Sequence, residues 1–454
     1  MLSHHLGVSA RVPPVGDEVI PVRAGGRPSG NPTAPSLPLR PQLFAEAMAA
    51  SAALACSVGL GLGILAVTDA VPGDRWTLTV QAHGSVQLFG WVAVFLCTLL
   101  FEFVVRLNQS DPLPFRSRLA AIALLGGGAI VQATGQVFHD EVGWLHGPGA
   151  VATLVGAIVA ALLVLRVRTS LLVKGDFHPW WFRAAVCWLV FASAAKVLSA
   201  FRAENGVVEL AESSFVLEAV LRGFVMSAIV GVGLRAFAGH LGLRPVLSRR
   251  QMVIFAGLNG SAVLWLAGSG AFGLPDSSGL QRAADVVMAI PAVLLTVWLG
   301  VLQKFRLDLA PPRYRFFLPW AWAGFATGAI VLVVVAVLPD WGERTIYEEG
   351  SARHLLFLGF MGPMMIGMSH IVLARFGTGG LEVAPALAFS FILMQIAWPL
   401  RVLPVLANDA PGDLACGIIT AGGIAAAASL ALLAYAAGRT AVLMRRAAKK
   451  HQRD

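Results

Sequence analysis

Long apolar stretches alternate with short polar segments along this chain from about residue 43 onward. A helix that spans a bilayer needs about 20 mostly apolar residues, and twelve stretches of the chain are that long. The predicted spans are 44–68, 80–105, 117–138, 147–167, 181–203, 212–238, 250–272, 281–304, 315–338, 352–374, 382–404 and 414–440. The segments between them are too short to hold a soluble domain. The pattern therefore predicts an all-α, polytopic membrane bundle of about twelve transmembrane helices, forming a single domain over 44–440.

The basic residues in the connecting segments predict the orientation of this bundle, because cytoplasmic loops carry an excess of Lys and Arg. Basic residues follow every even-numbered span, whereas the alternate loops are acidic or mixed. Both termini are therefore predicted to be cytoplasmic. We expect a disordered cytoplasmic tail over 1–43, which is rich in Pro, Gly and Ser, and a basic cytoplasmic tail over 441–454.

Composition agrees with the pattern, since 57% of the 454 residues are hydrophobic and 13% are charged. Soluble domains carry about 25% charged residues. The net charge of +9 is explained by membrane topology, and no nucleic-acid partner is expected. The four cysteines form no CxxC pair, which favours buried apolar roles over a disulfide framework. The lipid bilayer is the one partner that composition alone predicts.

A histidine and a glutamine stand unusually early in the second span, in the stretch QAHGSVQLFGW. His83, Gln87 and Gly90 follow the i, i+4, i+7 spacing and so share one helix face. The predicted topology places His83 about one turn into the bilayer from the outer side. A hydrogen bond to a neighbouring helix and a ligand site both explain such a histidine.

The tenth span begins SARHLLFLGF and runs in the same direction, so His354 is predicted at nearly the same depth as His83. His370 lies sixteen residues later, or about 24 Å along the axis at the usual helical rise, and cannot join the same small site. Two histidines at one depth on different helices suit the two axial positions of a haem iron. Arg353 and Arg401 are at a suitable depth for the haem propionates, although interfacial snorkelling also explains them.

Other polar or sulfur-containing positions allow weaker predictions. Met361, Met365 and Met368 share a face with His354, which fits Cu(I) ligation or, more often, adaptable packing. The outer loop from His139 to His146 could bind a surface metal ion or be a solvated loop. Charged residues inside spans are functional candidates by default. They are Lys196 in the fifth span and the i, i+4 pair Glu218 and Arg222 in the sixth, and they fit a proton or ion path, a substrate site or a structural ion pair.

Two segments carry a resemblance to a known family. The segments HGSVQLFGWVAVFLCTLLFEFVVRL (83–107) and ARHLLFLGFMGPMMIGMSHIVLARFG (352–377) resemble the second and tenth helices of NnrS-type membrane proteins. That family contains twelve-helix haem and copper proteins associated with nitric oxide and nitrosative stress, distantly similar to the main subunit of haem–copper oxidases. The resemblance implies a bacterial cytoplasmic (inner) membrane protein with a low-spin haem b, and copper as a second candidate cofactor.

By this resemblance His83 and His354 are the two haem ligands. Gln87 and Gly90, by their helix face, and Arg353 and Arg401, by their depth, are the other candidate cofactor-binding residues. The sixth and seventh spans lack the internal histidines that bind copper in the oxidases, so no binuclear active site is evident and no enzymatic activity is assigned. Filled axial positions favour electron transfer or sensing over gas binding. The implied function is nitrosative-stress handling or respiratory electron transfer, with an electron donor or respiratory-chain protein as partner.

Two other functional classes remain open at this point. A secondary transporter would explain twelve helices and the charges Lys196, Glu218 and Arg222 inside them. A membrane assembly or metal-delivery factor for a respiratory enzyme would explain the methionine stripe and the outer histidines. The sequence contains no P-loop, dinucleotide-binding, HExxH, CxxCH or GxSxG motif.

Overall fold

The computed structural model describes residues 41–68, 73–108, 110–167, 177–243, 245–304, 313–337, 353–376, 383–407 and 412–451. Throughout these residues the regular structure is helical, and residue pairs such as Glu204–Val207 form only isolated bridges. The predicted fold class, a polytopic all-α bundle, is confirmed. The predicted N-terminal tail lies outside the described residues except for its last three positions, which begin the first helix.

Each predicted span corresponds to one helical rod, and several rods contain a wider π-helical turn. The first six are α1 (Pro41–Leu54), η1 (Ala55–Gly59) and α2 (Leu60–Val67); α3 (Gly73–Ser85), η2 (Val86–Ala93) and α4 (Val94–Leu107); α5 (Phe115–Val137); α6 (His139–Val142), η3 (Gly143–Leu145) and α7 (His146–Arg166); α8 (His178–Arg202); and α9 (Leu210–Glu218), η4 (Ala219–Val225) and α10 (Met226–Leu241). The last six are α11 (Ser248–Ala267); α12 (Ser278–Leu299); α13 (Tyr314–Val337); η8 (Phe357–Met361) with α15 (Gly362–Phe376); α16 (Ala384–Ala407); and α17 (Asp413–His451).

Eleven of these rods, counted over the described residues, are long and apolar enough to cross a membrane. The seventh predicted span is the 20-residue helix α11, which begins with the polar run SRRQ and is less apolar than the others. The protein is therefore a multi-pass helical membrane protein.

The second, sixth and tenth rods are far more buried than the rest. In each of them 94% of the residues of the most apolar stretch are buried, whereas the other candidate spans reach at most 50%. Each of the three also contains a π-helical turn, at η2, η4 and η8. Single π turns inside α-helices are often found at functional sites. These three rods, here called the inner helices, are the first place to look for a site.

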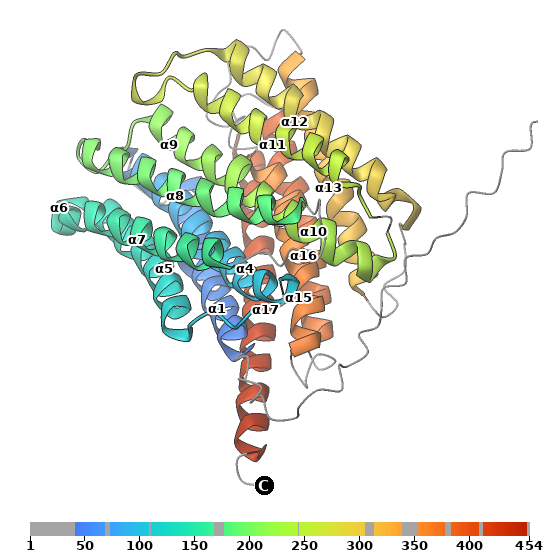
Figure 1. The fold of residues 1–454 in the computed structure, drawn as a ribbon. Coiled ribbons are helices and arrows are strands. Elements are labelled where there is room, and N and C mark those ends of the chain that lie inside the picture. Colours follow the sequence, from blue (N-terminus) through green and yellow to red (C-terminus); the bar gives the residue numbers. More distant parts are fainter. Residues whose placement is uncertain are drawn as a thin grey trace, which may run out of the picture. The chain divides into compact units, whose positions relative to one another are not determined.

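The other nine rods surround the inner helices in three groups of three. Consecutive helices contact each other within the groups α5–α7–α8, α11–α12–α13 and α16–α17–α1, and Figure 1 shows α5 beside α7 and α16 beside α17. Each inner helix packs between two groups: η2 contacts α1 and α5, η4 contacts α8 and α11, and η8 contacts α13 and α16. The sequence shows no repeat, yet the packing repeats every four helices.

Ion pairs, one of them buried, join helices at the end of the bundle predicted to be cytoplasmic. Arg118 on α5 donates to Glu102 on α4 at 2.7 Å, and both side chains are buried. The helix α17 continues to His451, so residues 441–451 of the predicted basic tail extend the last rod. Arg445 in this part pairs with Glu46 on α1.

Candidate functional site

The inner helices bring the two predicted ligand histidines together. The rings of His83 on α3 and His354, which begins the tenth rod, have centroids 6.5 Å apart and planes inclined by 17°. These residues are 271 positions apart in the sequence, so only the packing of the second helix against the tenth creates the pair. The predicted depth match between the two histidines holds in the structure.

The other side of the His83 ring is held by the first helix. Its Nδ1–H donates to the carbonyl oxygen of Gly59 at 2.6 Å, which leaves Nε2 as the nitrogen available to a ligand. A Cβ at Gly63 would lie 2.8 Å from ring atoms of His83, so glycine is needed for the ring to lie where it does. Metal-binding histidines usually donate their second ring N–H to a fixed acceptor in this way.

Gln87 and Gly90 lie on the same face as His83, as the helical spacing predicts. The Gln87 amide donates to the carbonyl oxygen of Ala55 at 3.2 Å. A Cβ at Gly90 would come within 2.9 Å of Leu54, so this glycine permits close approach of the two helices. All three residues therefore contact the first helix, but Gln87 and Gly90 face it instead of the partner histidine.

The two predicted arginines lie near the pair in different settings. Arg353 immediately precedes His354 and donates from Nε to Glu218 at 2.9 Å, while remaining partly exposed. Arg401 on α16 lies close enough to His83 to interact with it electrostatically. Each histidine of the pair therefore has a cationic side chain near it, Arg401 near His83 and Arg353 next to His354 in the chain.

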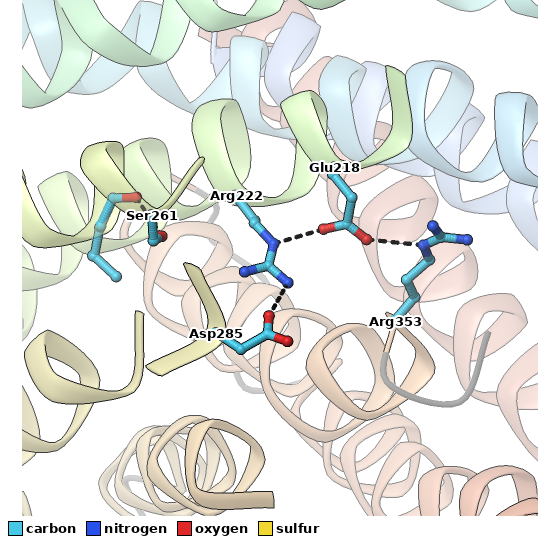
Figure 2. Close-up of polar contacts among 6 residues, drawn as sticks. Glu218, Arg222, Ser261, Asp285 and Arg353 are labelled. Carbon is cyan, nitrogen blue, oxygen red and sulfur yellow. Dashed lines mark hydrogen bonds and ion pairs between the residues drawn. The ribbon is translucent and has the colours of Figure 1, made fainter. Parts of the chain in front are cut away.

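A chain of buried charges begins at Arg353 and crosses three helices, as Figure 2 shows. Glu218 accepts from Arg353 and, at 2.8 Å, from Nε of Arg222. Arg222 donates in turn to Asp285 on α12 at 2.6 Å, and its guanidinium lies 5.8 Å from the Trp265 ring centroid. Two arginines therefore meet two carboxylates, and the group has no net charge. Asp285 has no exposed surface, and in the sequence it gave only the weak signal of one acid inside an apolar span.

The structure separates Lys196 from this charge network. Its Nζ donates to Ser85 Oγ at 2.7 Å and lies 3.8 Å from the centroid of the Phe89 ring, both on the second helix. The three residues grouped in the sequence as a proton or ion path therefore form two arrangements. Glu218 and Arg222 form the paired network, and Lys196 lies against the second helix.

The remaining histidines and methionines take other positions. His370 contacts the Phe317 ring, at a centroid distance of 5.7 Å. Met361, Met365 and Met368 are buried in the apolar core. Over the described ranges no group of three or more His, Cys, Asp or Glu side chains is arranged to hold a metal ion. Copper binding stays a prediction from sequence.

The donor set around His83 and His354 fits a haem. Two imidazoles that bind one metal ion end-on have ring centroids about 6 Å apart, because each metal–nitrogen bond is about 2 Å long. The observed centroid distance of 6.5 Å is close to this value, and the ring planes are inclined by 17°. Gly59 supplies the acceptor behind His83, and Arg353 and Arg401 supply cations for acidic substituents.

Comparisons with known proteins give a different indication. No protein-family model matches the chain. The chain is similar to "Probable potassium transport system protein Kup 3" of Geobacter sulfurreducens and to "Probable potassium transport system protein Kup 2" of Geobacter metallireducens. Each is 25% identical over 257 residues, which cover 50% of this chain and 41% of the relative. The alignment thus spans less than half of each relative, and membership of a family is not shown.

The fold and the site together define the class of this protein. It is a multi-pass helical membrane protein in which three buried helices, each with a π turn, gather a histidine pair and a balanced network of charges.

Proposed function

We propose that this protein binds a haem b through His83 and His354 in the outer half of a bacterial inner membrane, and that it serves in electron transfer or in sensing nitric oxide and related species. The single observation that carries the proposal is the 6.5 Å, nearly parallel arrangement of the two imidazoles. Two histidines can pack in this way without a cofactor. The arrangement also suits a haem iron, which can be held by an imidazole on each side.

The surrounding residues have distinct roles under this proposal. Gly59 fixes the tautomer of His83 through the Nδ1–H bond, so that Nε2 faces the metal. Arg353 and Arg401 would hold the propionates of a bound haem, and Glu218 holds the Arg353 side chain in place. The haem would supply one-electron redox chemistry.

The visible spectrum of the purified protein tests the proposal. We expect a Soret band with the sharp reduced bands of a low-spin haem after expression with ample haem. The variants His83→Ala and His354→Ala should each lose or alter it, because each removes one axial ligand. His370→Ala is the matched control, since His370 is a histidine on the same tenth rod but contacts Phe317 instead of the pair. A protein without haem, or one whose spectrum is the same in all variants, would refute the proposal.

The comparisons support a second candidate, a secondary transporter for a cation. The names of both similar proteins describe potassium transport systems. Glu218 and Arg222 of the network lie on an inner helix with a π turn, and charged residues inside membrane helices often mark substrate or ion sites in transport proteins. In this case Glu218 and Asp285 would exchange Arg222 for the transported ion during part of the cycle.

Ion flux in proteoliposomes distinguishes the two candidates. A transporter should accumulate the potassium analogue rubidium-86 in proteoliposomes, and the Glu218→Gln variant should lose this uptake. Glu102→Gln is the matched control. Glu102 is also a buried glutamate paired with an arginine, but it lies on α4, near the end predicted to be cytoplasmic, and pairs with Arg118 instead of the network. A clear haem spectrum without flux favours the first candidate, and flux without a haem spectrum favours the second.

A further inference from the structure

Lys196 is a buried cation whose partners among the described residues are uncharged. It is 5% exposed, and its ammonium group bonds the Ser85 hydroxyl and lies over the Phe89 ring. An ammonium group carries three N–H donors, and one of them is used by Ser85. The other two N–H donors of the ammonium group are thus available to other groups.

The other buried lysine and arginine side chains of the described residues are paired with carboxylates. Arg118 bonds Glu102, and Arg222 bonds both Glu218 and Asp285. Lys196, by contrast, has no carboxylate within ion-pair distance among the described residues. An unpaired buried charge costs several kcal/mol, so a balancing negative charge next to Lys196 would remove a large penalty.

The surroundings of Lys196 offer further donors and only positive or neutral groups. The Ser193 hydroxyl on the same face of α8 is fully buried and bonds no other group among the described residues. A lysine side chain on a helix leans toward the preceding turn, and therefore toward Ser193. His146 on α7 is buried and close enough to Lys196 to interact with it electrostatically. No acidic side chain takes part in this group.

A cavity at the predicted outer face lies near this group along α8. It has a volume of about 1200 Å³, and Arg202 is among its lining residues. Arg202 follows Lys196 by six residues on α8, or about 9 Å along the axis. Four acidic side chains line the cavity: Asp140 and Glu212, which pair with Arg75 and Arg202, together with Glu204 and Glu209.

We infer that Lys196, Ser85 and Ser193 form a binding site for a small monovalent anion of the size of chloride, nitrite or nitrate. The ammonium supplies the charge and the two hydroxyls supply further hydrogen bonds. Ser85 accepts from Lys196 and can turn its own O–H toward the anion. The site lies on a different face of the second helix from His83, because two residues along a helix turn the side chain by about 200°.

Anion-dependent stability and direct binding test the site. Purified protein in detergent should unfold at a higher temperature in sodium nitrate than in sodium gluconate of the same ionic strength, with a saturable dependence on nitrate. Labelled chloride should bind at one equivalent and be displaced by nitrate. Lys196→Gln should abolish both effects, whereas Arg116→Gln, which removes an exposed cation, should change neither.

A second variant covers the case in which Lys196→Gln does not fold. Ser85→Ala removes one hydroxyl and should weaken chloride binding by about tenfold. Absent chloride binding in the unmodified protein, or equal binding in Lys196→Gln, would overturn the inference. The His83→Ala variant should keep the anion effects even if it loses a haem spectrum, so the two proposals can fail independently.

Discussion

Two regions beside the second helix differ in how their buried charges are compensated. On the side of the histidine pair, Arg353, Glu218, Arg222 and Asp285 form a continuous series with two charges of each sign. On the side of α8, Lys196 contacts a hydroxyl and an aromatic ring. Both regions are buried in the same bundle, so the contrast does not come from depth.

The contrast teaches how a buried charge can be compensated. A network that includes its own counter-charges is complete without a ligand, and breaking it leaves a charge exposed to an apolar interior. A lone ammonium has no such counter-charge, so its removal should cost little in stability and its retention points to an external partner. Substitutions on the two sides should therefore differ in size and in their response to anions.

The largest effect is expected for Arg222→Met. This substitution leaves the Asp285 carboxylate, which has no exposed surface, without its cation. The loss of stability should be about 3–5 kcal/mol, the range for removing one partner of a buried pair. Thermal unfolding of the detergent-solubilised protein, followed by tryptophan fluorescence, measures it against the exposed-site control Arg116→Met. An unfolding temperature equal to that of the control would contradict the role of the network.

A smaller loss is expected for Asp285→Asn. Arg222 keeps its bond to Glu218, so one charge-assisted hydrogen bond is lost, worth about 2 kcal/mol. Combining Asp285→Asn with Arg222→Met should give a protein more stable than Arg222→Met alone, because no uncompensated carboxylate remains at position 285. Strict additivity of the two losses would show that the side chains do not interact.

Gly63→Ala tests whether the His83 ring packs against α2, on the side of the histidine pair. Its Cβ would lie 2.8 Å from the His83 ring, and displacing the ring should cost about 1–3 kcal/mol. Gly61→Ala, two residues earlier on α2, is the matched control, since no atom lies within 4 Å of its added Cβ. That control should gain up to about 1 kcal/mol from helix propensity. Equal unfolding temperatures for the two variants would contradict the position of the His83 ring against Gly63.

The smallest loss is expected for Lys196→Met in sodium gluconate, where no loss at all should occur. The ammonium has no carboxylate partner among the described residues, so its removal leaves no group unpaired and ends the free-energy penalty of an unpaired buried charge; the stability should stay the same or rise. The same unfolding assay measures it beside Arg222→Met. A loss as large as that of Arg222→Met would show that an internal counter-charge acts on Lys196 and would erase the contrast between the two regions.

The amino-acid sequence alone determined the helices and their faces. Apolar length predicts each span because the backbone in lipid must satisfy its hydrogen bonds within a helix. Helical spacing placed His83, Gln87 and Gly90 on one face, and the alternation of basic loops placed His354 at the depth of His83. These properties depend on residues close in sequence, so they can be deduced without knowing which helices are neighbours.

Only the tertiary structure decided which helices lie inside and which charges meet. The mean hydropathies of the inner helices, 1.7 to 2.3, fall within the range of the outer candidate spans, 1.4 to 2.4. Lipid and protein interiors favour the same residues, so hydropathy does not distinguish the two sets. The bonds from Arg222 to Asp285, from Glu218 to Arg353 and from Lys196 to Ser85 join residues 63, 135 and 111 positions apart. A charged side chain inside a span predicts that a partner exists, but only the packing of whole helices selects that partner, or leaves Lys196 without a charged one.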